Sequence, residues 1–182
     1  MRIGSGLTAV VTIICLTLTA AQATPAVWKE REFRFTYHGF TTSYSCEGLK
    51  HKVKVILAAL GARANPQVRA SGCEIGGGVA MSPRLHVRAA FPYLVPDDGV
   101  DGPVFAAQTD VVTLSPRSPR ELENGDCELV EQLRHKVFAE IGSRVLLDRT
   151  TCTPHQVNLG RPYIQLEVLR ATAGAEDSPD NL

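Results

Sequence analysis

Hydrophobic residues recur at helical spacing in two stretches of the chain. The first stretch, residues 45–61, starts at a serine suited to capping a helix and ends at a glycine suited to terminating one. The second stretch, residues 126–142, starts at an aspartate and also ends at a glycine. The apolar positions are Leu49, Val53, Ile56, Leu57 and Leu60 in the first stretch, and Val130, Leu133, Val137, Phe138 and Ile141 in the second. Each stretch therefore predicts an amphipathic helix with one face in a core.

Alternating apolar and polar positions predict six β-strands around these helices. In the first strand, for example, Phe33, Phe35 and Tyr37 share one face, and the residues between them are polar. The predicted strands are residues 32–37, 67–71, 85–93, 104–114, 144–151 and 163–169. We therefore predict an α+β fold in two layers, with two helices packed on a mostly antiparallel sheet of about six strands.

The order strand, helix, strand, strand occurs twice, which indicates a possible βαββ duplication. Residues 46–63 align without gaps on residues 127–144. The alignment pairs a cysteine, a glutamate and a glycine at equal positions, namely Cys46 with Cys127, Glu47 with Glu128 and Gly61 with Gly142. Any two amphipathic helices share an apolar period, so coincidence is the alternative. The matched cysteine, glutamate and glycine go beyond that period and favour an internal repeat.

Each predicted repeat has a second cysteine, Cys73 or Cys152, at the end of the strand that follows its helix. A helix of about 15 residues and a strand of about 7 residues both span roughly 22–23 Å. The N-terminus of the helix therefore lies beside the end of that strand, which predicts the disulfides Cys46–Cys73 and Cys127–Cys152. The alternative is a reactive thiolate at each helix N-terminus. An even number of cysteines in an exported chain favours disulfides.

Residues 1–23 have the pattern of a secretory signal peptide. Arg2 precedes an apolar run of about 15 residues, and the sequence Ala21-Gln22-Ala23 suits signal peptidase. The run is shorter than the roughly 20 residues that span a bilayer, which argues against a stable membrane anchor. Isoleucines precede Cys15, where a lipoprotein signal has small residues. We expect cleavage after Ala23 and export to the periplasm or to the medium.

Charge and composition narrow the remaining classes. The chain has 19 basic and 19 acidic residues and a formal net charge of zero. This balance lacks the basic excess of nucleic-acid-binding domains, so we expect no nucleic-acid partner. Residues 24–170 are long enough for one domain, which we predict to be stapled by the two disulfides. Residues 171–182 are small, polar and acidic, and they predict a disordered tail.

Motifs for catalysis, metals and cofactors are weak. The glycines at 76–78 lack the Lys-Ser/Thr ending of a phosphate-binding loop, and no G-x-S-x-G is present. The cluster of Asp97, Asp98 and Asp101 does not match an EF-hand. His38 and His86 are the one histidine pair on predicted strands that could share a face as metal ligands or as acid and base. We therefore assign no catalytic residue, no metal site and no cofactor.

The turn at residues 39–46 is the candidate binding segment. It joins a predicted strand to a helix N-terminus, where ligands are often bound. Its aromatic and hydroxyl side chains suit recognition, and they are Phe40, Thr41, Thr42, Tyr44 and Ser45. The alternative is a capped turn with a buried aromatic residue.

Two segments carry a resemblance to known proteins: residues 37–49 and the sequence Gly125-Asp126-Cys127-Glu128-Leu129-Val130. They resemble a group of small exported proteobacterial proteins of unassigned function. The resemblance covers most of the chain after the signal peptide, and it implies no activity and no catalytic residue. We expect a non-catalytic envelope protein that binds a protein, cell-wall or small-molecule partner. The alternative is an exported hydrolase, which a concave pocket joining the 39–46 turn to titratable residues would favour.

Overall fold

The computed structural model describes residues 23–73, 78–96, 99, 102–152 and 161–172. The predicted signal peptide before Ala23, glycines 76 and 77, the three aspartates at 97, 98 and 101, and the tail from residue 173 lie outside the described residues. Among the described residues, no helix is long and apolar enough to cross a bilayer.

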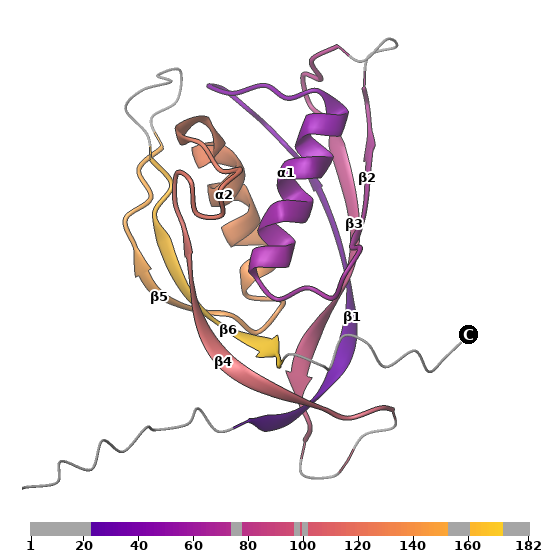
Figure 1. The fold of residues 1–182 in the computed structure, drawn as a ribbon. Coiled ribbons are helices and arrows are strands. Elements are labelled where there is room, and N and C mark those ends of the chain that lie inside the picture. Colours follow the sequence, from indigo (N-terminus) through magenta and orange to yellow (C-terminus); the bar gives the residue numbers. More distant parts are fainter. Residues whose placement is uncertain (1–22, 74–77, 97–98, 100–101, 153–160, 173–182) are drawn as a thin grey trace, which may run out of the picture.

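The chain forms the predicted order of strand, helix, strand, strand twice (Figure 1). The first half consists of β1 (Thr24–Thr36), α1 (Cys46–Ala59), β2 (Gln67–Ser71) and β3 (Arg84–Leu94). The second half consists of β4 (Phe105–Leu114), the 3-10 turn η1 (Asn124–Asp126), α2 (Cys127–Leu133), the π-helical turn η2 (Arg134–Phe138), β5 (Arg144–Asp148) and β6 (Ile164–Ala171). The side chain of Ser45 caps α1 by accepting a hydrogen bond of 3.1 Å from the Gly48 N–H, as predicted.

The six strands form one sheet in the order β2-β3-β1-β4-β6-β5, and every neighbouring pair is antiparallel. The predicted α+β class is therefore confirmed. From the centre outward, the first half is ordered β1, β3, β2 and the second is ordered β4, β6, β5. Gly61 and Gly142, which the sequence aligns, both have positive φ, at 87° and 72°. The two halves thus repeat one topology and end their helices in the same backbone conformation.

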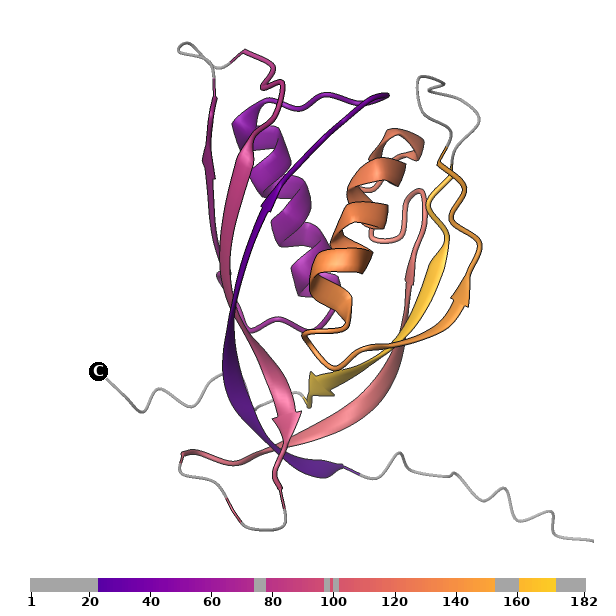
Figure 2. The ribbon, with the colours of Figure 1, turned by 180° about the vertical axis from the view of Figure 1, so that it is seen from behind.

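The two halves of the sheet are joined by a short contact. β1 pairs with β3 over residues 26–36, but it pairs with β4 only through Thr24–Ala26 against Phe105–Ala107. Beyond this junction β1 and β4 diverge, and α1 and α2 lie side by side between the two halves (Figures 1 and 2). The junction therefore holds the sheet together at one end and leaves the rest of β1 beside α2.

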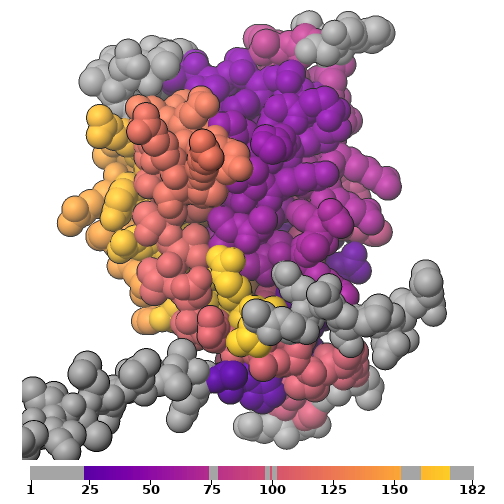
Figure 3. Space-filling model, in the orientation of Figure 1, coloured from indigo at the N-terminus to yellow at the C-terminus, as the bar shows by residue number. Residues whose placement is uncertain are grey.

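The core fills the space between the helices and the inner face of the sheet. Nine of the ten predicted apolar helix positions are buried, and Ile141 is partly buried against them. Phe33, Phe35 and Tyr37 are buried on the inner face of the first strand and in the turn that follows. The space-filling view shows side chains of α1 and of the segment after β4 in contact across the front of the molecule (Figure 3). The predicted apolar faces are thus the faces that the fold buries.

Four elements differ most from the sequence prediction. β6 continues to Ala171, the first residue of the predicted tail. β1 begins at Thr24 rather than at residue 32. The second helix changes to π-helical geometry at Arg134, and β5 ends at Asp148 rather than at residue 151. Asp126 precedes α2, but its carboxylate accepts from the Glu123 N–H at 2.7 Å instead of capping α2. That carboxylate is used by the turn described below.

Both predicted disulfides are present. Cys46 is bonded to Cys73 and Cys127 to Cys152, with Cα–Cα distances of 6.0 and 5.6 Å. Each bond joins the first residue of a helix to the chain just beyond the following strand. The geometric argument from helix and strand length therefore holds in both halves.

Removing one disulfide is expected to destabilise the protein measurably. The pairs are 27 and 25 residues apart, and closing a loop of this size stabilises by about 3 kcal/mol in the chain-entropy model. The variant Cys127→Ala/Cys152→Ala should lose about that much free energy of unfolding in urea denaturation. Peptide mapping of unreduced protein prepared in an oxidising compartment is the control, and four free thiols there would contradict the pairing.

Candidate functional site

The turn between β1 and α1 is anchored to the N-terminus of α2 by one buried carboxylate. Glu128, which is 6% exposed, accepts hydrogen bonds from the Phe40 N–H at 2.9 Å, the Thr41 N–H at 3.1 Å and the Thr41 hydroxyl at 3.0 Å. The first turn of a helix is a favourable place for a carboxylate. The Glu128 side chain therefore fixes the path of the turn.

A side-chain amide holds the start of the same turn. The His38 N–H donates to Gln132 Oε1 at 3.1 Å, and Gln132 Nε2 donates to the His38 carbonyl at 2.7 Å. Gln132 thus bonds to both backbone groups of one residue, as a neighbouring strand would. Because Glu128 and Gln132 are four residues apart on α2, they lie on the same helix face.

A second buried carboxylate, Asp126, holds the other end of the turn. Asp126 is 2% exposed and accepts from the Tyr44 hydroxyl and from Lys52 Nζ, the latter at 2.9 Å. The Tyr44 ring lies 5.3 Å from the ring of Tyr37, whose hydroxyl donates to the Thr42 carbonyl at 2.7 Å. Burial and the nearby carboxylates raise the pKa of both tyrosines, so both hydroxyls remain neutral donors.

Close packing leaves the turn little freedom. A Cβ atom on Gly39 would lie 2.0 Å from the Thr42 carbonyl oxygen, and one on Gly125 would lie 2.8 Å from the Thr42 hydroxyl oxygen. At Gly39 the neighbouring atom is backbone, so only glycine allows the turn to fold on itself there. At Gly125 the neighbouring atom belongs to the Thr42 side chain. The segment that carries the predicted binding residues is therefore closely packed.

The structure gives the five predicted binding residues different roles. Tyr44 is buried, and Ser45 caps α1. Thr41 bonds to Glu128, and the Thr42 carbonyl accepts from Tyr37. Phe40 is 63% exposed, and it is the member of the set that lines a pocket. Recognition by this turn stays a prediction, and the geometry centres it on Phe40.

That pocket, which we call the α2 cleft, has a volume of about 750 Å³. One wall is the end of β1, another is the polar face of the helix formed by α2 and η2, and the Phe40 turn closes one end. The lining residues are Arg34, Phe35, Thr36, His38, Phe40, Glu128, Glu131, Gln132, His135, Lys136 and Cys152. Figure 2 shows β1 crossing the molecule beside this helix. The volume falls within the range of ligand-binding pockets.

The wall formed by β1 is an open strand edge. Alternate residues of an antiparallel strand direct both backbone groups to the same neighbour. The Tyr37 N–H donates to the Pro83 carbonyl, so odd-numbered residues of β1 face the β3 side, and even-numbered His38 faces Gln132 instead. Arg34 and Thr36 therefore direct their N–H and C=O groups toward the α2 cleft. Within the described part of the chain, no strand pairs with β1 on this side beyond Ala26.

Sequence reasoning missed the helix side of the cleft. Glu128, Glu131, Gln132 and His135 recur at the spacing of one helix face, but the sequence shows them only as the polar side of an amphipathic helix. The alignment of the two repeats contains one signal of the helix side of the cleft, at the glutamate that both copies share. Glu47, which aligns with Glu128, is a surface residue paired with Lys50, whereas Glu128 is buried. A buried acid in one copy alone indicates a specialised role.

The other candidate pair does not converge. His38 lines the α2 cleft, while His86 lies on β3 with Nε2 2.9 Å from Glu32 Oε1 and lines a different hollow. Among the described residues, no three His, Cys, Asp or Glu side chains are grouped to hold a metal ion. The three aspartates at 97, 98 and 101 lie outside the described residues.

Comparison with known proteins gave no match to a family model, to a curated protein or to a solved structure. The function is therefore argued from the geometry of the α2 cleft.

Proposed function

We propose that this protein is an exported, non-catalytic binding module that holds an extended segment of a partner polypeptide in the α2 cleft. The observation that carries the proposal is the open edge of β1, where Arg34 and Thr36 present backbone donors and acceptors to a pocket of about 750 Å³. An extended peptide can add to such an edge as a further strand. Two disulfides and the signal-like N-terminus support an exported location.

The cleft supplies both parts of strand-addition binding. Main-chain hydrogen bonds to β1 would provide affinity, and pockets for alternate side chains would provide selectivity. Phe40 offers an exposed ring, on a turn anchored by Glu128, for an apolar ligand side chain. Glu131 and His135, exposed one helical turn apart, face the ligand with polar groups. The expected ligand is therefore an extended peptide with an apolar residue near Phe40 and polar residues along the helix.

Replacing Thr36 with proline is expected to weaken peptide binding without disturbing the sheet. The Thr36 N–H faces the cleft and not β3, so Thr36→Pro removes a donor that only the ligand would use. The probe is a linear peptide selected against the protein from a random displayed library. Thr36→Pro should weaken its affinity about tenfold in calorimetric titration, which corresponds to one lost hydrogen bond and a crowded edge.

Thr36→Ala is the matched control, because it changes the side chain and keeps the backbone donor. It should bind the selected peptide as the unmodified protein does, and both variants should melt alike. Equal binding by Thr36→Pro and Thr36→Ala would show that the peptide does not pair with β1.

The same pocket favours a second candidate, an exported hydrolase, because it joins the turn at Phe40 to His38, Glu131 and His135. Against this, the Glu128 carboxylate already binds the turn, and Cys152 is held in a disulfide. The test is mass spectrometry of the selected peptide after incubation with the protein. Cleavage that His135→Gln abolishes would replace the binding function with hydrolysis.

A further inference from the structure

The outer face of the first half-sheet is densely basic. Even-numbered residues of β1 and β3 and odd-numbered residues of β2 point away from the helices, because the residues between them are mostly buried. The strand register places these outward residues in three rows of three, which are Gln67, Arg88 and Glu32; Arg69, His86 and Arg34; and Ser71, Arg84 and Thr36. We call these nine residues the outer basic face. None of them is apolar.

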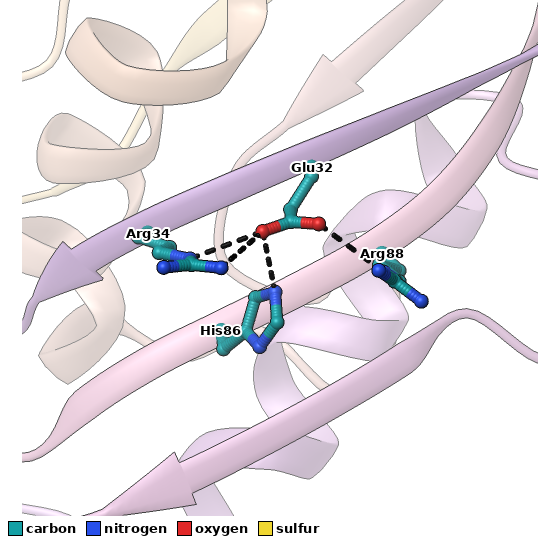
Figure 4. A network of polar contacts seen from close by, with 4 residues as sticks. All are labelled: Glu32, Arg34, His86 and Arg88. Carbon is teal, nitrogen blue, oxygen red and sulfur yellow. Dashed lines mark hydrogen bonds and ion pairs between the residues drawn. The ribbon is translucent and has the colours of Figure 1, made fainter.

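Glu32, the one acid of this face, contacts three side chains of the same face. Glu32 lies 2.6 Å from an Arg34 nitrogen, 2.9 Å from His86 Nε2 and 3.2 Å from Arg88 Nε (Figure 4). Hydrogen bonds from Arg34 and Arg88 and the contact with His86 lower the pKa of Glu32 to about 2. Glu32 therefore stays ionised and orders two arginines and His86 around itself. Four arginines against one glutamate leave the face with a formal charge of +3, in a chain whose net charge is zero.

Two arginines at the other end of the face have no such partner. The side chains of Arg69 and Arg84 form no hydrogen bond or ion pair with any other residue that the structure describes, and both are exposed. In the register, Arg69 is opposite His86 and Arg84 is opposite Ser71, so the two arginines are diagonal neighbours with Cα atoms about 7–8 Å apart. They line a hollow of about 660 Å³ whose other polar lining residues are Arg34, Thr36, Ser71 and His86, and none of the described residues that line it is an acid.

The second half-sheet shows that the fold does not require this charge. Its corresponding outward positions include Val111, Thr113 and Gln165, and Arg144 there is paired with Glu167 at 2.9 Å. At corresponding outward positions, the first half-sheet is therefore basic and the second is neutral. Unpaired like charges on adjacent strands destabilise a sheet, so the arginine cluster lowers the stability of the free protein. An anionic ligand bound there would offset this repulsion.

We propose that the outer basic face binds a small ligand that carries more than one phosphate group, with Arg69 and Arg84 as its principal contacts. Guanidinium groups bind phosphate through two parallel hydrogen bonds, and two arginine side chains on adjacent strands can each bind one of a pair of linked phosphates. The hydroxyls of Ser71 and Thr36 border the same hollow and add further donors. The hollow adjoins the α2 cleft along β1, because Arg34, Phe35 and Thr36 line both. The principal contacts are distinct, since neither Arg69 nor Arg84 lines the cleft.

The test is calorimetric titration with inorganic tripolyphosphate at fixed ionic strength. The unmodified protein should bind it, and Arg69→Gln/Arg84→Gln should lose affinity at least about tenfold. Lys54→Gln/Arg120→Gln is the matched control, because it removes the same charge from exposed residues elsewhere and should bind as the unmodified protein does. The melting temperature of Lys54→Gln/Arg120→Gln should match that of the unmodified protein, and that of Arg69→Gln/Arg84→Gln should be equal or higher, since the change removes two exposed like charges from adjacent strands.

A second arm separates a soluble phosphate ligand from a phospholipid surface. Sedimentation with vesicles of phosphatidylcholine containing phosphatidylglycerol should leave the protein in the supernatant at physiological salt, because the face has no apolar side chain to insert. Vesicle binding without tripolyphosphate binding would overturn the proposal in favour of a membrane surface. Equal loss of affinity in the two double variants would overturn it in favour of nonspecific charge attraction.

Discussion

Asp126→Ala is expected to lower the free energy of unfolding by about 3–5 kcal/mol, because it removes the nearer counter-charge of a mostly buried lysine and leaves only Glu123, whose Oε1 lies 4.0 Å from Lys52 Nζ. Asp126 is 2% exposed, and Lys52, whose side chain is 15% exposed, lies 2.9 Å from it. The same carboxylate accepts from the Tyr44 hydroxyl and the Glu123 N–H. Asp126→Ala therefore takes away an acceptor from three donors: the Tyr44 hydroxyl, Lys52 Nζ and the Glu123 N–H.

The measurement is urea denaturation of Asp126→Ala beside Lys52→Met and the double variant. Lys52→Met alone should also destabilise, and the double variant should lose less than the sum of the two single losses, since each single change strands the other charge. Additive losses would mean that the ion pair is not coupled. A loss below about 1 kcal/mol for Asp126→Ala would contradict its role in holding the turn.

The second large effect separates two aromatic residues of one turn. Tyr44 is buried and bonded to Asp126, so Tyr44→Ala should cost about 3–5 kcal/mol in the free energy of unfolding. Phe40 is 63% exposed, so Phe40→Ala should change the stability by no more than about 0.5 kcal/mol. Thermal and urea denaturation of the two variants, with binding of the selected peptide, separates packing from recognition.

Phe40→Ala is expected to weaken binding of the selected peptide while Tyr44→Phe leaves that binding intact. Tyr44→Phe serves as the control, because it keeps the packed ring and removes only the hydroxyl. A large loss of stability in Phe40→Ala would show that the ring is packing, and unchanged peptide binding in that variant would remove Phe40 from the proposed site.

Much of the fold follows from local sequence. The apolar stripe of α1, with Ser45 before it and Gly61 after it, marks a helix and its face without reference to the rest of the chain. The disulfides followed from the equal lengths of a helix and a strand. The start of β1 was missed because Ala26 and Val27 are both buried at the junction with β4, so the alternation that marks a strand fails there.

The candidate site depended on contacts that the sequence does not show. The turn was located correctly, but nothing local distinguishes Phe40 from Tyr44, since both are aromatic residues in one turn. Tyr44 is bonded to Asp126, 82 residues further along the chain, and the Phe40 backbone is bonded to Glu128, 88 residues further along. These distant contacts bury one ring and leave the other exposed. The basic outer face was hidden for a similar reason. Its arginines come from three strands, and the net charge of zero for the whole chain gives no sign that they are gathered on one face.

Amide hydrogen exchange along β1, measured by NMR in the free protein and in its complex with the selected peptide, tests the open edge most directly. In the free protein, the Arg34 and Thr36 amides should exchange rapidly, while those of Phe33 and Phe35 should be protected by β3. In the complex, Arg34 and Thr36 should become protected as well. Protection of these two amides in the free protein, or rapid exchange that persists in the complex, would contradict strand addition in the α2 cleft.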